Sequence, residues 1–313
     1  MFKNEHHIKL SDSVIWLKAC KALQRNDRSI FTPSAFPNPY TALRSIRKDF
    51  KKMTWFMKGN ILISPALLRE NSQYLKEHQK NHSVNHPHCK QLIINFYLAP
   101  FDQFMNRFIT RDNRIKYVRY GTEFVIGMQS SKQKARIFYE SSQMFIKHKF
   151  ANIPHTLSFA HLEKSFQFYK YTIRLIKNPH KQIRLEIPRC ELDKFASVKQ
   201  YGQLRTFTST HRTKILHYSE IDIMRTYNRE LLAIAKYYRL ADNFSDLGKL
   251  FYLAESSFLK TIANKRRSTV KKVGRRLRKH NQGVLSLRYF QPDGIRQYST
   301  FIRLKDIRYL NKR

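Results

Sequence analysis

Apolar side chains recur at helical spacing through the last hundred residues of the chain. They fall on one face of a helix from Tyr227 to Ala241, and again from Ser245 to Ala263. Ser268 is placed to cap a third, shorter helix. The segment from Gly283 to Arg303 has the pattern of a hairpin with a turn at Pro292–Gly294. The C-terminal third is therefore expected to be mostly helical.

The first 180 residues alternate between helical and strand patterns. Helical patterning from Val14 to Leu23 ends at Pro33, Pro37 and Pro39. Few apolar runs occur between about 180 and 215, where we place a boundary. The mixture predicts an α+β protein. The spacing predicts helices over 41–50, 92–108 and 131–150, strands over 55–63 and 166–176, and a hairpin over 117–128.

Sixty Lys and Arg residues against 22 Asp and Glu residues give the chain a formal charge of +38. Each phosphate that a base neutralises releases counterions, so a chain of this charge favours a polyanion. Hydrophobic residues make up 42% of the chain, which is enough to build packed cores. The composition therefore predicts a folded nucleic-acid-binding protein, with a histone-like packing protein, a ribosomal protein and a membrane-surface protein as alternatives. Only 8 glycines are present, which argues against a glycine-rich phosphate loop.

Ten bases and no acid lie between residues 260 and 279. A solvated helix face normally mixes both signs of charge, so this run indicates phosphate contact rather than solvation alone. Upstream, Tyr238 lies on the apolar stripe and is expected in the core, whereas Tyr237 is a candidate for contact with a nucleic acid. The candidate binding residues are Lys260, Lys265, Arg266, Arg267, Lys271, Lys272, Arg275, Arg276, Arg278, Lys279 and Tyr237.

The C-terminal helices carry a family resemblance. The segments Tyr227–Tyr238 and Ser256–Lys265 resemble the maturase domain, or domain X, of group II intron-encoded proteins. That domain has a Tyr-Asn…Gly-Ile…Tyr-Tyr helix followed by a helix that ends in Thr-Leu-Ala-x-Lys. Ala233 stands where the family usually has Gly, a change that suits a helix interior. Ser219 and Glu220 match the Ser-Glu that commonly precedes the first of these helices.

The resemblance extends upstream to a reverse-transcriptase palm. The segment Tyr117–Gly127 is similar to the palm hairpin Tyr-Ala-Asp-Asp-Phe, and Asn95–Met105 is similar to the helix before it. Trp55–Asn60 is similar to the strand Trp-x-x-x-Gly-Asp, and residues 36–46 are similar to the segment before that strand. The resemblance therefore implies an eroded, N-terminally shortened palm followed by an α-helical thumb and a helical maturase domain.

The resemblance also locates the positions of the polymerase carboxylates. In an active palm, three Asp side chains hold two Mg²⁺ ions, and here those positions fall on Asn60, Thr122 and Glu123. Only Glu123 retains a carboxylate, so we expect no polymerase activity and no catalytic residue. The family's Pro-Gln-Gly motif is not recognisable between His78 and Leu92. An active group II intron reverse transcriptase remains the alternative.

A histidine-rich segment raises the question of a metal site. His78 and His82 are spaced as an i, i+4 pair, but no second cluster completes a four-ligand zinc site. A polar loop in place of lost palm structure is the simpler interpretation. The segment also contains His86, His88 and Cys89. Cys20 and Cys190 lie far from it, so the sequence predicts no disulfide framework, no metal and no cofactor.

Together these features predict two domains and a non-enzymatic role in RNA splicing. Residues 1–180 are expected to form the degenerate palm-like domain, and 181–313 the thumb connection and maturase domain X. The protein is expected to bind a group II intron in its precursor transcript and to assist intron folding and splicing. A generic nucleic-acid-binding or ribosome-associated basic protein is a further alternative. Other splicing proteins are open as partners, and no membrane is expected as one.

Localisation follows from the resemblance and from composition. Group II introns occur in bacteria, mitochondria and plastids. The start of the chain shows no apolar signal region and carries Glu5 and Asp12, which transit peptides usually avoid. The bias to Lys, Asn, Ile, Phe and Tyr fits an AT-rich genome. We therefore expect a protein that is encoded and acts in a plastid, with the mitochondrion as the alternative.

Overall fold

The structure is a computed structural model that describes residues 38–64, 86–109, 114–177, 180–279, 283–290 and 296–311. The chain divides into two compact units. Unit 1 comprises Met1–Tyr169 with Leu175–Ile183, and unit 2 comprises Lys170–Arg174 with Arg184–Arg313. The expected helix over Val14–Leu23 and the turn at Pro292–Gly294 lie outside the described residues.

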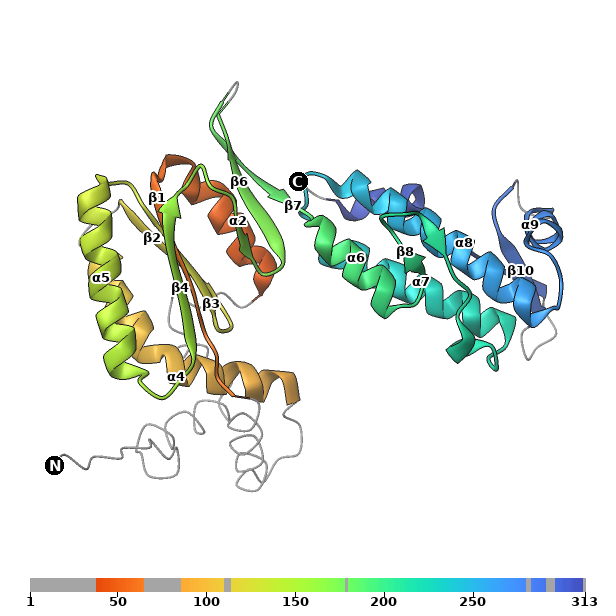
Figure 1. The fold of residues 1–313 in the computed structure, drawn as a ribbon, viewed down its shortest axis with the longest axis horizontal. Helices are drawn as coiled ribbons and strands as arrows, with labels where there is room; N and C mark the ends of the chain where they lie inside the picture. Colours follow the sequence, from red (N-terminus) through yellow and green to blue (C-terminus); the bar gives the residue numbers. More distant parts are fainter. Residues whose placement is uncertain are drawn as a thin grey trace. The chain divides into compact units, whose positions relative to one another are not determined.

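Unit 1 is built on a four-stranded sheet with the strand order β2-β3-β1-β4 (Figure 1). Strand β1 pairs antiparallel with both β3 and β4, and β2 pairs antiparallel with β3. The expected strand from residue 55 and the expected hairpin over 117–128 are confirmed, with the hairpin turn at residues 121–122. The strands are β1 (Trp55–Ile61), β2 (Ile115–Tyr120), β3 (Glu123–Met128) and β4 (His155–His161).

Three helices cover the two faces of this sheet. Phe101 and Met105 of α4 (His86–Ile109) and Ile146 of α5 (Lys132–Lys149) share one apolar core with the sheet. Helix α2 (Pro39–Asp49) lies on the other side of the sheet and ends in the short 3-10 helix η3 (Phe50–Lys52). The three expected helices are therefore confirmed. Ser131 caps α5, because its side-chain hydroxyl accepts a hydrogen bond from the Lys134 backbone at the start of the helix.

The expected strand over 166–176 is wrong, because the chain turns in its middle. Strand β5 (Phe166–Phe168) and strand β6 (Tyr171–Ile176) are separated by Tyr169 and Lys170, both at positive φ. The apolar alternation changes phase at the turn, because Phe168 and Tyr171 are three residues apart. Neither turn residue is a glycine, so the turn lacks its usual residue signal. Strand β7 (Gln182–Glu186) completes a three-stranded sheet, and the division between the units runs through β6 and β7.

Unit 2 contains three helices that run alongside one another, with a fourth packed against α8 (Figure 1). The bounds of α7 and of α9 differ from expectation. Ser219 caps α7, which therefore begins seven residues earlier than Tyr227, and Thr269 rather than Ser268 caps α9 because its hydroxyl accepts a hydrogen bond from the Lys272 backbone. The helices are α6 (Arg189–Val198), α7 (Glu220–Tyr237), α8 (Leu247–Lys265) and α9 (Val270–Arg278).

Short elements complete unit 2. The expected C-terminal hairpin is confirmed as β10 (Ser286–Phe290) paired antiparallel with β11 (Arg296–Thr300). The stretch over 180–215, despite its few apolar runs, contains β7, α6 and the small hairpin of β8 (Gly202–Gln203) and β9 (Thr208–Ser209). Three 3-10 helices are η4 (Thr213–Ile215), η5 (Phe244–Asp246) and η6 (Leu304–Leu310). No helix in the described ranges is both long and apolar enough to span a bilayer.

Candidate nucleic-acid interface

Helix α9 is held on α8 by one apolar face. Val273 and Leu277 are buried, and Gly274 lies between them. A methyl group on Gly274 would lie 3.9 Å from Leu259 of α8, which shows how closely the two helices approach. At the C-terminal end, the Arg278 guanidinium donates a hydrogen bond of 2.8 Å to the Glu255 carboxylate of α8. The opposite face of α9 is therefore fixed toward solvent.

That outer face carries five positive charges. At about 100° per residue they fall within an arc of about 140°. All are exposed, and none of their side chains forms a hydrogen bond or an ion pair within the described part of the chain. Arg267, another base of the run, lies before the helix and is not on this face; its backbone is at positive φ. The five residues, called here the basic face, are Lys271, Lys272, Arg275, Arg276 and Lys279.

The basic face opposes the stability of its own helix. Lys271 with Arg275, and Lys272 with Arg276, are like-charge pairs at i, i+4 spacing, which disfavours helix formation. Lys271 and Lys272 also lie in the first turn, where the partial positive charge of the helix dipole repels a cation. A polyanion bound along this face would relieve both effects.

The other four bases of the run have protein partners. Lys260 donates to the Ser209 carbonyl oxygen at 2.7 Å, and Lys265 donates to the Leu216 carbonyl oxygen at 2.8 Å. Arg266 forms a two-bond pair with Glu220 of α7 at 2.6 and 2.5 Å, which raises the pKa of Arg266. Arg278 pairs with Glu255. These four side chains tie α8 and α9 to their surroundings, and contact between them and RNA stays a prediction.

The two tyrosines at the end of α7 differ in environment. Tyr238 is buried, as expected for its place on the apolar stripe, and burial raises the pKa of its phenol. Tyr237 is half-buried, its ring stacks on Tyr171, and its carbonyl oxygen accepts a hydrogen bond of 2.6 Å from the Tyr171 hydroxyl. A role for Tyr237 in RNA contact stays a prediction.

Several residues that carry the family resemblance hold the elements of unit 2 together. Tyr227 is fully buried, and its hydroxyl lies 2.9 Å from Ser257 Oγ and 3.2 Å from Thr261 Oγ1. Thr261 in turn accepts a hydrogen bond from the Arg212 backbone at 3.0 Å. Asn228 donates to the Thr300 carbonyl oxygen and accepts from the Ile302 backbone, at 2.7 and 3.0 Å. These motif residues therefore join α7 to α8 and to the end of the C-terminal hairpin.

Sequence reasoning missed a polar cluster beside Tyr227. The Arg212 guanidinium lies over the Tyr227 ring at 4.9 Å and bonds both carboxylate oxygens of Glu230. Tyr201 donates a hydrogen bond to the same carboxylate at 2.8 Å, and burial, followed by the charge of Glu230, raises the pKa of the Tyr201 phenol. Glu230 lies three residues after Tyr227 in α7, so both side chains lie on the same side of the helix. That spacing was the sequence signal that could have placed an acid beside Tyr227.

The three positions expected to carry polymerase carboxylates meet at the end of the β2–β3 hairpin. Asn60 is the register partner of Glu123 across β1 and β3, and the Thr122 carbonyl oxygen accepts a hydrogen bond from the Ile61 backbone at 3.2 Å. Glu123 accepts a hydrogen bond of 2.9 Å from the backbone of Tyr169, in the positive-φ turn between β5 and β6. The Glu123 carboxylate thus holds the backbone of Tyr169 within unit 1.

The histidine-rich segment supplies no site that can be described. His78 and His82 lie outside the described residues, and His86, His88 and Cys89 lie in α4, where only the backbone is described. Among the side chains that are described, no three His, Cys, Asp or Glu residues gather in a way that could hold a metal ion.

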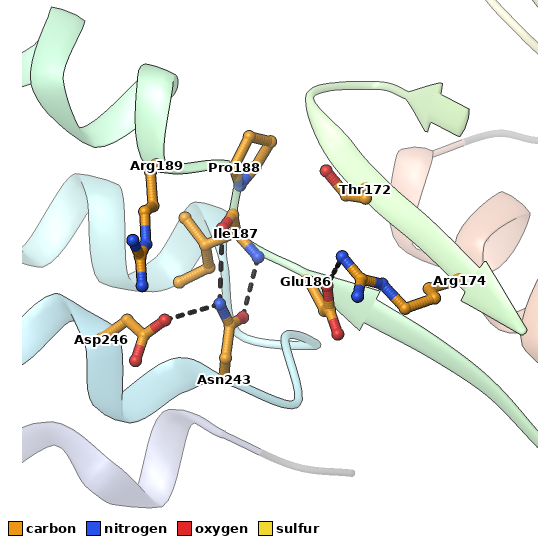
Figure 2. A pocket seen from close by; sticks show the side chains of 8 residues that line it. All are labelled: Thr172, Arg174, Glu186, Ile187, Pro188, Arg189, Asn243 and Asp246. Carbon is orange, nitrogen blue, oxygen red and sulfur yellow. Dashed lines mark hydrogen bonds and ion pairs between the residues drawn. The ribbon is translucent and has the colours of Figure 1, made fainter. Parts of the chain in front are cut away.

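A cavity of about 530 Å³ opens in unit 2 where β7 leads into α6 (Figure 2). Asn243 accepts a hydrogen bond from the Ile187 backbone and donates one to the Asp246 carboxylate, each at 2.8 Å. Arg174 pairs with Glu186 at 3.3 Å on the facing wall. These polar groups bind one another. Their contacts connect β7 to the segment before α8, so we assign them a structural role.

Comparisons with known proteins relate this chain to intron maturases. Residues 180–307 match the family model described as type II intron maturase. The group II intron-encoded protein LtrA of Lactococcus lactis subsp. cremoris is 32% identical over 178 residues, which cover 50% of this chain and 30% of LtrA. Maturase K of Chara globularis is 26% identical over 252 residues, which cover 72% of this chain and 46% of that protein. The chain thus matches about a third to a half of the length of these relatives, and the expected resemblance is confirmed.

Proposed function

We propose that residues 180–307, which match the type II intron maturase model, form a maturase domain, and that the protein binds a group II intron and assists its folding and splicing. The observation that carries the proposal is the basic face of α9. It is exposed, it has no acidic partner in the described ranges, and it lies within the matched region. The precursor transcript that contains the intron is the proposed partner.

The proposed mechanism is electrostatic and needs no bond chemistry by the protein. Each phosphate that the basic face neutralises releases condensed counterions, which favours binding. If the face fits the folded intron better than the unfolded one, binding shifts the RNA population toward the folded form by that difference in affinity. The intron RNA then performs transesterification itself. The protein core, including the Tyr227 and Arg212 contacts, keeps the basic face in place.

We further propose that the palm-like unit has no polymerase activity. Two Mg²⁺ ions in a polymerase palm need several carboxylates. Asn60 and Thr122 offer none, and the Glu123 carboxylate is engaged by the Tyr169 backbone. These residues do not fit a two-ion site, so unit 1 is proposed to act as a structural platform.

The plastid is the proposed site of action. The similarity to Maturase K of Chara globularis and Chara connivens supports this choice over the mitochondrion. The genomic position of the reading frame tests it: a frame inside a group II intron of plastid DNA is the expected result, and a frame in mitochondrial DNA would contradict it.

Splicing in a purified system tests the main proposal. The full chain is mixed with precursor RNA that carries its intron, at a Mg²⁺ concentration too low for the intron to splice alone. We expect faster splicing and binding that weakens steeply with salt. Equal affinity for unrelated RNAs with no change in splicing would contradict the proposal.

Primer extension tests the polymerase part. An RNA template with an annealed DNA primer should give no product with this protein. Template-dependent synthesis that Glu123→Ala abolishes would establish an active reverse transcriptase instead, and the proposal for unit 1 would fail.

A further inference from the structure

Two exposed aromatic rings stack on each other at the surface of unit 2. Phe207, at the tip of the β8–β9 hairpin, and Tyr252 of α8 have ring centroids 5.3 Å apart and ring planes inclined by 24°. Phe207 is 42% exposed and Tyr252 is 62% exposed. The contact therefore covers only part of each ring and leaves aromatic surface in solvent.

The hairpin that carries Phe207 is fixed to α8. Ser209 Oγ lies 2.8 Å from Ser256 Oγ, and the Ser209 carbonyl oxygen accepts a hydrogen bond of 2.7 Å from Lys260. Tyr252, Ser256 and Lys260 follow each other at i, i+4 spacing along α8, so they form one stripe beneath the hairpin. The two rings are thus held in a defined position rather than on a loose loop.

The backbone of Phe207 is in a conformation that a bulky side chain rarely adopts. Its φ is +58°, in the left-handed region that Gly, Asn and Asp enter more easily. Strained conformations of this kind gather at functional sites, where the surrounding structure maintains them. The exposed ring of Phe207 is therefore a candidate for function.

The charges around the pair suit a polyanion. Arg205 in the same hairpin is 85% exposed and pairs with Asp193 at 3.1 Å, and the exposed Lys249 lies one helical turn before Tyr252. The Arg278–Glu255 ion pair joins the C-terminal end of α9 to α8 three residues beyond Tyr252. A chain of phosphates that follows the basic face can therefore continue toward these rings.

We propose that Phe207 and Tyr252 form a stacking site for an unpaired nucleobase of the RNA that the basic face binds. The proposal rests on the proposed function and adds to it a preference for single-stranded RNA at one point of the interface. Aromatic side chains accept bases of any sequence because every base has a flat π-face, and a flanking cation holds the adjoining phosphate. The site needs no hydrogen-bond readout of the base.

The test measures the binding of two RNA probes to full-length variants. Phe207→Asn removes the ring and keeps a residue that tolerates positive φ. Tyr252→Gln removes the second ring and keeps a good helix former. Each change should weaken binding of a short oligoadenylate by about 5- to 150-fold, the range for one stacked base. The affinity for a blunt RNA duplex of equal length should not change.

Salt dependence and aromatic variants separate stacking from other effects. The slope of log affinity against log salt should stay at the wild-type value, because every phosphate-binding base is still present. Phe207→Tyr and Tyr252→Phe should bind oligoadenylate as the wild type does. Tyr309→Ala, which removes another exposed ring with 68% exposure, should have no effect.

Wild-type affinity of Phe207→Asn and Tyr252→Gln for oligoadenylate would overturn the proposal. Equal losses for both probes, or failure of the aromatic variants to retain binding, would also overturn it, because a role in folding alone predicts those results. A different result would show that the proposed function is wrong. If the protein does not bind RNA through the basic face, removing the charges of that face would leave the binding of both probes unchanged.

Discussion

Arg119 of β2 and Asp102 of α4 form a two-bond ion pair in which neither side chain is exposed to solvent. The two hydrogen bonds measure 2.8 and 2.5 Å, and the Tyr117 hydroxyl donates a third to Asp102 at 2.6 Å. Arg119 also reaches the Asn95 side chain and the Gly121 carbonyl oxygen. This network lies beneath the hairpin turn that precedes Glu123, so it fixes the hairpin against α4.

Asp102→Ala should strongly destabilise unit 1. The change leaves the Arg119 charge buried without its partner, and removal of one member of a buried pair lowers the free energy of unfolding by about 3–5 kcal/mol. Denaturant unfolding of the full chain measures the decrease. The matched control is Glu140→Ala, which breaks the exposed Arg136–Glu140 pair of α5 and should change stability by about 0.5 kcal/mol or less. Similar decreases for both variants would contradict the role assigned to burial.

Gly59→Ala should destabilise the sheet of unit 1. A methyl group at this position in β1 would overlap the Phe124 ring, and overpacking of a core typically lowers the free energy of unfolding by about 1–3 kcal/mol. Gly248→Ala in α8 is the control. Its methyl group would lie 3.7 Å from Leu304 in ordinary contact, so a gain of about 0.4–1 kcal/mol is expected. Thermal unfolding distinguishes them, and a stabilised Gly59→Ala variant would show that Phe124 does not pack against β1 at this position.

Tyr227→Phe should weaken the junction of α7 and α8. The substitution removes the hydroxyl shared with Ser257 and Thr261 and leaves the ring in place. Removal of a buried hydrogen bond costs about 1 kcal/mol of stability. Burial raises the pKa of this phenol, so the wild-type hydroxyl stays protonated at neutral pH. Denaturant unfolding at pH 7 measures the change, and an unaltered midpoint would mean that these hydrogen bonds contribute nothing to stability.

Long elements with a clear period could be predicted from the sequence. Leu231 and Ile234 in α7 mark a face that burial then confirms, and the apolar run around Val125 predicts a strand, β3, that is buried on both faces. Prediction failed where two short elements follow each other closely. The apolar alternation changes phase between Phe168 and Tyr171, but no glycine or proline marks the two-residue turn at positive φ that separates their strands.

Sequence patterns also could not separate the roles of the basic residues. The run over 260–279 is uniform in charge, yet Lys260 and Arg266 turn toward protein groups while Lys271 and Arg275 face solvent. That division depends on which acids and carbonyl oxygens the fold brings close. Glu220 is 46 residues from Arg266 in the chain, so no local pattern reveals their pairing. The same holds for the contact between Phe207 and Tyr252.

Charge reversal of the basic face tests the central claim most directly. The variant carries Lys271→Glu, Lys272→Glu, Arg275→Glu and Arg276→Glu in the full chain. Val273 and Leu277 are unchanged, and acids in the first turn suit the helix dipole, so α9 should still fold. The control reverses four exposed lysines of α5 in the same way, which alters net charge equally. These are Lys132, Lys134, Lys147 and Lys149.

The measurement is the rate of intron splicing at low Mg²⁺, together with the affinity for the precursor RNA across a range of salt concentrations. We predict that the α9 variant no longer accelerates splicing and that its affinity falls far more than that of the α5 control. Its salt slope should also fall, by about 0.7–0.9 for each phosphate that the protein no longer neutralises. Transcripts joined at the wild-type rate by the α9 variant, with unchanged affinity, would contradict the claim that α9 grips the intron.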